Sequence, residues 1–200
     1  MGGDPPLGGG VSVPAGAEAL LDPGRTVLVV VDLQQKLLPA IDERERVLRN
    51  SLLLLRLGHV LELPVILTTQ YRKGLGEIVP EVTLAAPGVA ALDKVAFGCF
   101  GSAEFAARMA GFALRDQIVV AGIESHICVA QTVLGALGKG FNVHVAADAV
   151  GSRTAENRAI GLRRMEAAGA VITSAEMAIY ELLGRSDAAA FKAMLPHLRG

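Results

Sequence analysis

Residues 119–129 read Val119-Val120-Ala121-Gly122-Ile123-Glu124-Ser125-His126-Ile127-Cys128-Val129. An apolar run ends at a glycine, a polar turn follows, and Cys128 opens a second apolar run. We predict a strand over Gln117–Ile123 and a helix over Ile127–Gly138. A helix N-terminus carries partial positive charge and free N–H groups, so a cysteine there is expected to favour the thiolate. A buried cysteine is also a common core residue, and this segment alone leaves an inert Cys128 as the alternative.

Strands and helices alternate on both sides of this segment. Further strands are predicted over Thr26–Val31, Leu63–Thr69, Phe141–Ala147 and Ala170–Thr173, with Ala91–Phe97 as an ambiguous short strand. Further helices are predicted over Glu43–Leu61, Ser102–Gly111, Thr154–Gly169, Ser174–Leu183 and Asp187–Leu195. Residues 70–76 are predicted to be a loop. Such alternation predicts an α/β fold, with a parallel sheet that helices cover on both faces.

Composition argues against several classes of partner. The 200 residues carry a formal net charge of −1, and 52% of them are hydrophobic. A near-neutral chain with 4% aromatic residues and no Trp offers neither the basic surface nor the stacking platform of a nucleic-acid or membrane binder. Two cysteines are too few for a disulfide framework or a cysteine zinc site.

The first residues are Gly- and Pro-rich, and they lack the basic start and apolar core of a signal peptide. We therefore expect a flexible tail over residues 1–16 and a single domain over residues 17–200. The expected location is the cytoplasm, where thiols stay reduced.

Asp32, Lys94 and Cys128 each fall at the predicted end of a strand. The carboxyl ends of parallel strands share one edge of the sheet, so these three side chains can meet there. Cys128 would attack a carbonyl, Asp32 would take and return its proton, and Lys94 would pair with Asp32. Backbone N–H groups of the turn, including that of Cys128, could stabilise an oxyanion by roughly 3 kcal/mol. If Lys94 is considered alone, the simpler interpretation is that it is a solvated charge on the surface.

Three motifs carry a resemblance to a known family. They are Val30-Val31-Asp32-Leu33-Gln34, Asp93-Lys94-Val95-Ala96-Phe97 and Gly122 through Val129. From about Thr26 to Ser174 the chain resembles the isochorismatase-like cysteine hydrolases. Its similarity to the isochorismatase domain-containing branch rests on residues 69–76, 79–81, 147–150, 152–153 and 191–192.

The resemblance implies a three-layer α-β-α sandwich around a six-stranded parallel sheet. It also implies a catalytic triad of Asp32, Lys94 and Cys128. A cis peptide is implied between Ile123 and Glu124, with the Glu124 and Cys128 N–H groups forming an oxyanion hole.

Two departures from family patterns narrow the activity. Nicotinamidases of this family resemble one another in a metal site that includes several histidines, whereas residues 68–71 here hold none. We therefore predict no metal and no cofactor, and we expect no nicotinamidase activity. In the resembling family, the members that hydrolyse the vinyl ether of isochorismate do not use a cysteine nucleophile. The presence of Cys128 therefore disfavours that reaction here.

The remaining polar and aromatic residues near the expected site need separate interpretations. The predicted substrate contacts are Gln70, Tyr71, Phe97, Phe100, His126 and Ile127. Core packing is the alternative for the aromatic side chains, and local capping or solvation is the alternative for the histidine. Asp148, although it follows a predicted strand, is expected to be a capping or structural residue.

The sequence thus predicts a metal-independent cysteine hydrolase that cleaves a small molecule's amide-type C–N bond through a thioester. A homo-oligomer is expected. The alternative is a catalytically silent oligomeric scaffold or interaction module with the same fold. We expect a depressed pKa of the Cys128 thiol in the enzyme and a value near the free-thiol value, roughly 8.5, in the scaffold.

Overall fold

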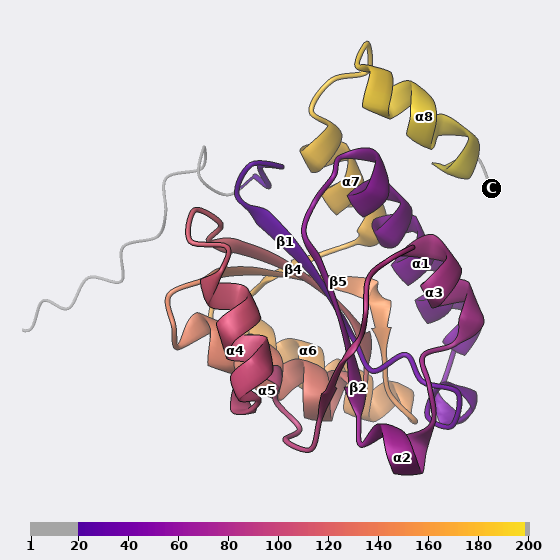
Figure 1. Cartoon of the computed structure of the whole chain (residues 1–200), viewed down its shortest axis with the longest axis vertical. Helices are drawn as coiled ribbons and strands as arrows, with labels where there is room; N and C mark the ends of the chain where they lie inside the picture. Colours follow the sequence, from indigo (N-terminus) through magenta and orange to yellow (C-terminus); the bar gives the residue numbers. More distant parts are fainter. Residues whose placement is uncertain (1–19, 199–200) are drawn as a thin grey trace, which may run out of the picture.

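The computed structural model describes residues 20–198 (Figure 1). The expected tail over residues 1–16 lies outside the described residues. The strands are β1 (Thr26–Val31), β2 (Val65–Gln70), β3 (Leu92–Lys94), β4 (Gln117–Ile123), β5 (Asn142–Gly151) and β6 (Val171–Thr173). The α-helices are α1 (Arg44–Val60), α2 (Arg72–Leu75), α3 (Pro80–Ala85), α4 (Ala103–Ala110), α5 (Ala130–Leu137), α6 (Ala155–Ala167), α7 (Ala175–Leu183) and α8 (Ala189–Leu198). Shorter turns are the 3₁₀ segments Leu38–Ala40 and Cys99–Gly101 and the π-helical turn Ser125–Val129.

All six strands form one parallel sheet in the order β3-β2-β1-β4-β5-β6. β1 and β4 lie at its centre, and every residue of both strands is buried, as their uninterrupted apolar sequences predict. The chain builds outward from β1 to β3 and then crosses back to β4. The strand order therefore reverses between β1 and β4, which is where open α/β sheets bind their ligands.

Helices cover both faces of the sheet, which confirms the predicted α-β-α sandwich. One core contains buried side chains of α1, α3, α7 and α8, and the other contains those of α4, α5 and α6 (Figure 1). Successive side chains of β1 pack into the two cores alternately. Leu28 and Val30 pack into the first core, and Val27 and Val29 pack into the second.

Three of the predicted helices begin with a side-chain cap at the residue where their predicted range starts. The side chains of Ser102, Thr154 and Ser174 accept hydrogen bonds from the backbone N–H groups of Phe105, Asn157 and Met177. These oxygens satisfy N–H groups that have no partner within the helix, so the starts of α4, α6 and α7 follow from local sequence alone.

β5 is longer than the predicted strand, which was expected to end before Asp148. The pairing of β4 with β5 jumps from Val120↔Val145 to Gly122↔Val150, so β5 bulges between these pairs and then continues to Gly151. A bulge breaks the alternation of side chains on which strand prediction depends. Asp148 lies in this bulge, and its Oδ1 accepts a 2.7 Å hydrogen bond from Ala175 N at the start of α7. Its predicted structural role is confirmed.

Two other local predictions are corrected. The expected loop over residues 70–76 contains the last residue of β2 and the single turn α2. The helix after the central turn begins as a π-helical turn, because Glu124 O accepts from Val129 N, five residues on, at 3.1 Å. α5 begins only at Ala130, so Cys128 lies in the widened turn that precedes it.

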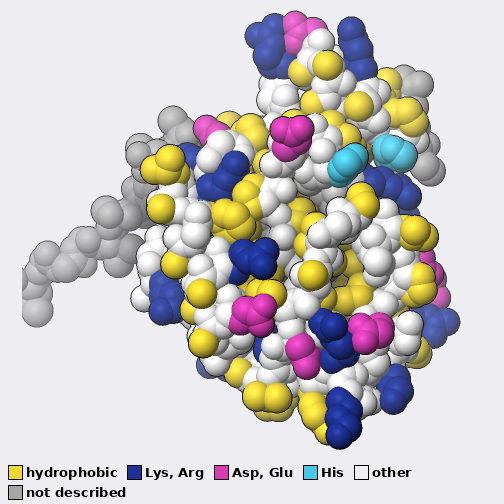
Figure 2. Space-filling model, viewed as in Figure 1, with side chains coloured by type: hydrophobic (Ala, Val, Ile, Leu, Met, Phe, Trp, Pro, Cys, Tyr) yellow, Lys and Arg dark blue, Asp and Glu magenta, His cyan; other side chains and the backbone are white. Residues whose placement is uncertain are grey.

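On the face in Figure 2, Lys and Arg side chains are interspersed with Asp and Glu, in keeping with the net charge of −1. Among the helices of the described residues, none has the length and apolar character needed to cross a membrane.

Candidate active site

Four polar side chains meet at the carboxyl edge of the sheet. Asp32 follows β1, Gln70 ends β2, Lys94 ends β3, and Cys128 lies in the turn after β4. The strand register aligns these ends, since Gln70 pairs with Lys94 and Val31 pairs with Gly122. Residues almost one hundred positions apart in sequence are thus brought to one place by the parallel sheet, as their positions after strands predict.

Lys94 and Asp32 form a buried ion pair. The Lys94 Nζ to Asp32 Oδ2 distance is 2.7 Å, and the two side chains are 1% and 0% exposed. Thr68 Oγ1 donates to the other carboxylate oxygen, Asp32 Oδ1, at 2.7 Å. Both oxygens of Asp32 therefore have a donor, which offsets part of the cost of removing the charge from water. The predicted pairing of Lys94 with Asp32 is confirmed.

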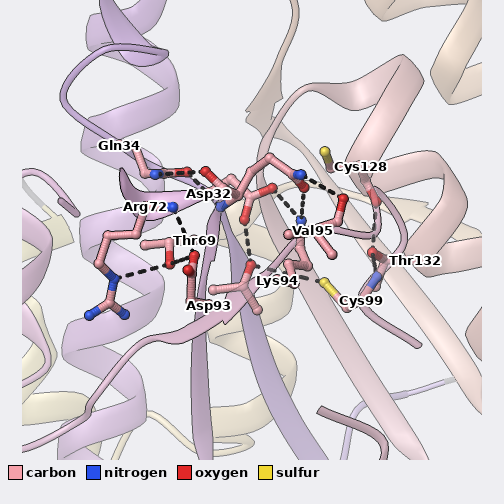
Figure 3. A network of polar contacts seen from close by, with 12 residues as sticks. Asp32, Gln34, Thr69, Arg72, Asp93, Lys94, Val95, Cys99, Cys128 and Thr132 are labelled. Atoms are coloured by element: carbon pink, nitrogen blue, oxygen red, sulfur yellow. Dashed lines mark hydrogen bonds and ion pairs between the residues drawn. The ribbon is translucent and has the colours of Figure 1, made fainter. Parts of the chain in front are cut away.

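Gln70 holds in place the ammonium group of Lys94, a residue that Figure 3 labels together with Asp32 and Val95. Its Oε1 accepts from Lys94 Nζ at 2.9 Å, and its Nε2 donates to Val95 O at 2.9 Å. Because both ends of the amide are bonded, its orientation is fixed and its oxygen faces the positive charge. Gln70 was predicted to contact substrate, and the bonds that it makes here are to the protein.

Gln34 in turn fixes the Gln70 backbone. Its Oε1 accepts from Gln70 N at 2.7 Å, and its Nε2 donates to Gln70 O at 3.1 Å and to Gly76 O at 2.7 Å. One buried side chain thereby joins the end of β1, the end of β2 and the turn after α2. Sequence reasoning did not assign Gln34 or Thr68 to the site. The available signal for Gln34 was its place two residues after Asp32 in the quoted motif.

The turn after β4 depends on Gly122. Its φ is 111°, and a Cβ atom there would overlap the backbone of Val31 on the neighbouring strand. Only glycine allows β1 and β4 to approach so closely just before the turn. The next peptide bond, Ile123–Glu124, is cis.

Cys128 is joined through Thr132 to the 3₁₀ segment that follows β3. Thr132 Oγ1 donates to Cys128 O at 2.7 Å and accepts from Cys99 N at 3.0 Å. The Cys99 side chain is fully buried, and its Sγ lies 3.9 Å from Thr68 Oγ1. The second thiol thus packs in the core beside Thr68, the residue that donates to Asp32.

The Cys128 thiol retains its proton, contrary to expectation. Burial is the main cause that raises its pKa to about 12, and the negative charge of Asp32 acts in the same direction while Lys94 opposes it. The start of a helix favours a thiolate, but desolvation and a neighbouring carboxylate outweigh that effect here. The Asp32 carboxylate therefore lies near enough to the thiol for its charge to act on it.

The predicted aromatic contacts lie in different environments. Tyr71 and Phe97 are 50% and 54% exposed, next to Gln70 and close in sequence to Lys94. Phe100 instead packs edge-to-face on Phe105, with ring centroids 5.0 Å apart. Two rings are therefore free to meet a ligand beside the strand ends, while the third packs with the α4–α5 layer.

Glu124, His126 and Ile127 of the turn are partly buried. His126 Nδ1 lies 2.9 Å from Ser152 Oγ, and Ile127 packs against the core that contains Cys128. The Glu124 carboxylate forms an ion pair with Arg153, at 3.1 Å. The Glu124 side chain is thus already paired, which leaves only its backbone for the role that the resemblance implies.

No cluster of three or more His, Cys, Asp or Glu side chains that could bind a metal occurs within residues 20–198. The absence of a metal or cofactor stays a prediction.

Comparison with known proteins defines the family. The model of the isochorismatase domain matches residues 26–177, which include every strand of the sheet. The chain belongs to the isochorismatase family. It is 34% identical over 177 residues to the secreted isochorismatase effector Isc1 of Phytophthora sojae, covering 87% of this chain and 84% of the relative.

Solved structures of this isochorismatase fold are also similar to the chain. The MAR1 ribonuclease of Caenorhabditis elegans has a TM-score of 0.85 and 33% identity, covering 90% of this chain and 93% of its own. YcaC of Pseudomonas aeruginosa, with hexane-2,5-diol and covalent acrylamide, has a TM-score of 0.83 and 28% identity, with 89% and 91% coverage. YcaC of Escherichia coli, described as an octameric hydrolase of unknown specificity, has a TM-score of 0.83 and 27% identity, with 89% and 90% coverage. A hydrolase is therefore the activity that this family membership supports.

Proposed function

We propose that this protein is a metal-independent cysteine hydrolase of a small molecule's amide-type C–N bond, working through a thioester. The observation that supports it most is the buried Asp32 carboxylate, which Lys94 holds and whose charge acts on the Cys128 thiol. A base held beside a protonated nucleophile is the arrangement that general-base-assisted attack requires.

In the first half of the reaction, Cys128 Sγ attacks the carbonyl carbon while its proton passes to Asp32. The carbonyl oxygen becomes an oxyanion, which the backbone N–H groups of Glu124 and Cys128 stabilise. Collapse of this intermediate breaks the C–N bond. Asp32 returns the proton to the leaving nitrogen, and the acyl group remains on Cys128 as a thioester.

In the second half, Asp32 takes a proton from water as the water oxygen attacks the thioester. The C–S bond breaks, the acid is released, and the proton returns to the sulfur. Lys94 holds the Asp32 carboxylate in position through the buried ion pair in both halves. Gln70 orients Lys94 for that task.

The raised pKa of Cys128 changes the expected behaviour of such an enzyme. Because the resting group is a thiol, attack depends on proton transfer to Asp32 rather than on a preformed thiolate. A depressed thiol pKa, the criterion taken from the sequence, therefore does not separate an enzyme from a scaffold. Turnover of a substrate and covalent capture of Cys128 distinguish an enzyme from a scaffold.

The experiment combines an amide panel with a covalent probe. Small primary amides would be screened by ammonia release, and acrylamide, which is covalently bound in the Pseudomonas aeruginosa relative, would be followed by intact mass. We expect turnover of at least one amide and one acrylamide adduct, both lost in Cys128→Ala. Cys99→Ala is the matched control, because it removes the other buried thiol, and it should keep both signals.

Failure to release ammonia from any amide, together with no adduct on folded protein, would favour the silent scaffold. Release that persists in Cys128→Ala would contradict the assigned nucleophile. RNA belongs in the same panel because the Caenorhabditis elegans relative is named a ribonuclease. We expect no RNA cleavage, since the Lys94 charge at this site is buried and already paired.

A homo-oligomer in the cytoplasm completes the proposal. The Escherichia coli relative is described as octameric, whereas the Phytophthora sojae relative is described as secreted. Light scattering of the purified chain and fractionation of the source cells test these two statements separately.

A further inference from the structure

A hollow of about 450 Å³ lies outside the sheet, between α1, α3 and α8. Its lining comprises Leu52, Arg56, His59, Val60, Glu81, Leu84, Ala85, Pro87 and His197. None of these residues belongs to the Asp32–Cys128 site. The volume falls within the range of small-molecule pockets.

Three basic side chains line this hollow. Arg56 and His59 are three residues apart on α1, and His197 comes from α8. All three are exposed, and none has a hydrogen bond or ion pair within residues 20–198. Figure 2 shows two histidine side chains side by side, with Lys or Arg side chains adjoining them. A positive charge in the last turn of α1 favours the helix dipole, which explains His59 but not a second histidine from another helix.

The rest of the lining is mainly apolar. Leu52 and Val60 come from α1, and Leu84 and Ala85 come from α3. Leu84 is 80% exposed, an unusual position for a large apolar side chain on a charged surface. A second hollow of about 270 Å³ shares His59, Ala85 and Pro87 with the first, and the Glu62 side chain also lines it.

We propose that this hollow binds an amphiphilic organic anion, a carboxylate or phosphate monoester with a short hydrocarbon body. The Arg56 guanidinium presents a fork of N–H donors that suits either anion, and the histidines add two further donors. The apolar lining accommodates the hydrocarbon. The Glu81 carboxylate also lines the hollow and disfavours the anion, so its charge limits the affinity.

The test is calorimetric titration of the full chain with octanoate and with hexyl phosphate. 1-Octanol supplies a hydrocarbon body alone, and inorganic phosphate supplies an anion alone. We expect an amphiphilic anion to bind at least tenfold more tightly than either half-probe. Octanol equal to octanoate, or phosphate equal to hexyl phosphate, would overturn the proposal. Which of the two amphiphiles binds more tightly identifies the headgroup.

Charge variants give effects of opposite sign. Arg56→Gln should weaken binding about tenfold, as for loss of a charge-assisted hydrogen bond. Glu81→Gln should strengthen it, because it removes the like charge. Arg49→Gln is the matched control, since Arg49 is an exposed arginine on α1 that does not line the hollow.

Thermal melting of each variant shows that it is folded. Equal affinity in Arg56→Gln and Arg49→Gln would overturn the proposal, as would weaker binding in Glu81→Gln. The proposal does not depend on the hydrolase activity. Binding in Cys128→Ala should match the unsubstituted protein.

Discussion

Two ion pairs of nearly equal length lie in opposite environments. Lys94 Nζ and Asp32 Oδ2 are 2.7 Å apart with side chains 1% and 0% exposed, whereas Arg185 Nη2 and Asp187 Oδ2 are 2.6 Å apart with side chains 76% and 66% exposed. The first pair lies between strand ends, and the second lies in the connection between α7 and α8.

Distance alone says little about what each pair does. In water the charges of the exposed pair are screened, and separating them leaves each group solvated. At the strand ends neither charge can be resolvated without rearrangement, so each group needs the other. The buried pair is therefore maintained because each of its charges depends on the other.

The largest effect is expected from Lys94→Met, which leaves the Asp32 charge buried without its main partner. We expect the free energy of unfolding to fall by about 3–5 kcal/mol, measured by urea denaturation. The double variant Lys94→Met/Asp32→Leu should lose much less, because no unpaired charge remains. A single variant as stable as the double one would contradict the dependence of the two charges on each other.

Gln70→Leu should have the next largest effect. It removes one acceptor of Lys94 and the side-chain donor to Val95 O. We expect a loss of about 1–3 kcal/mol in the same assay, as for a buried polar group left without a partner. Gln35→Leu is the control, because Gln35 is an exposed glutamine, next in sequence to Gln34. It should change stability by less than about 0.5 kcal/mol. Equal losses at the two positions would count against a special role for Gln70.

The thiol beside the buried pair makes stability depend on pH. Its pKa is about 12 in the folded protein, against roughly 8.5 for a free thiol, so the folded state keeps a proton that the unfolded state loses. The protein should therefore lose stability as the pH rises above about 9, by roughly 1.4 kcal/mol per pH unit. Cys128→Ala removes this contribution, so the difference between the two denaturation curves isolates it. A difference that stays flat from pH 8 to 11 would refute the raised thiol pKa.

The smallest effect is expected at the exposed pair. Asp187→Asn breaks the Arg185–Asp187 contact but leaves both groups in water, so the denaturation midpoint should not change measurably. Adding 1 M NaCl should leave this comparison unchanged. A clear loss of stability in Asp187→Asn would show that solvent exposure does not determine how much each ion pair contributes to stability.

Local sequence was sufficient for much of the fold. The strand at β1 and the start of α7 at Ser174 are predicted from neighbouring residues, and both are confirmed. The end of β5 was not predictable in this way, because its bulge depends on pairing with β4 and on the contact of Asp148 with α7.

The site was predictable in its positions but not in its energetics. Strand ends placed Asp32 and Lys94 together correctly. The prediction of a lowered thiol pKa was wrong. A helix start can be recognised in the sequence, whereas the burial of the thiol and its proximity to Asp32 arise only in the folded chain. The contacts of Gln34 with the end of β2 and with Gly76 likewise exist only after folding. The catalytic roles and the pocket residues stay proposals.

Gly122 has a consequence for how the chain tolerates mutation. A scan of all substitutions should find this position among the least permissive in the protein, although glycine has no side chain to contact a substrate or donate a proton. The constraint comes from the space that the Val31 backbone already occupies. A position at this edge of the sheet can thus resist substitution because it has no room for a Cβ atom, and not only because its side chain reacts.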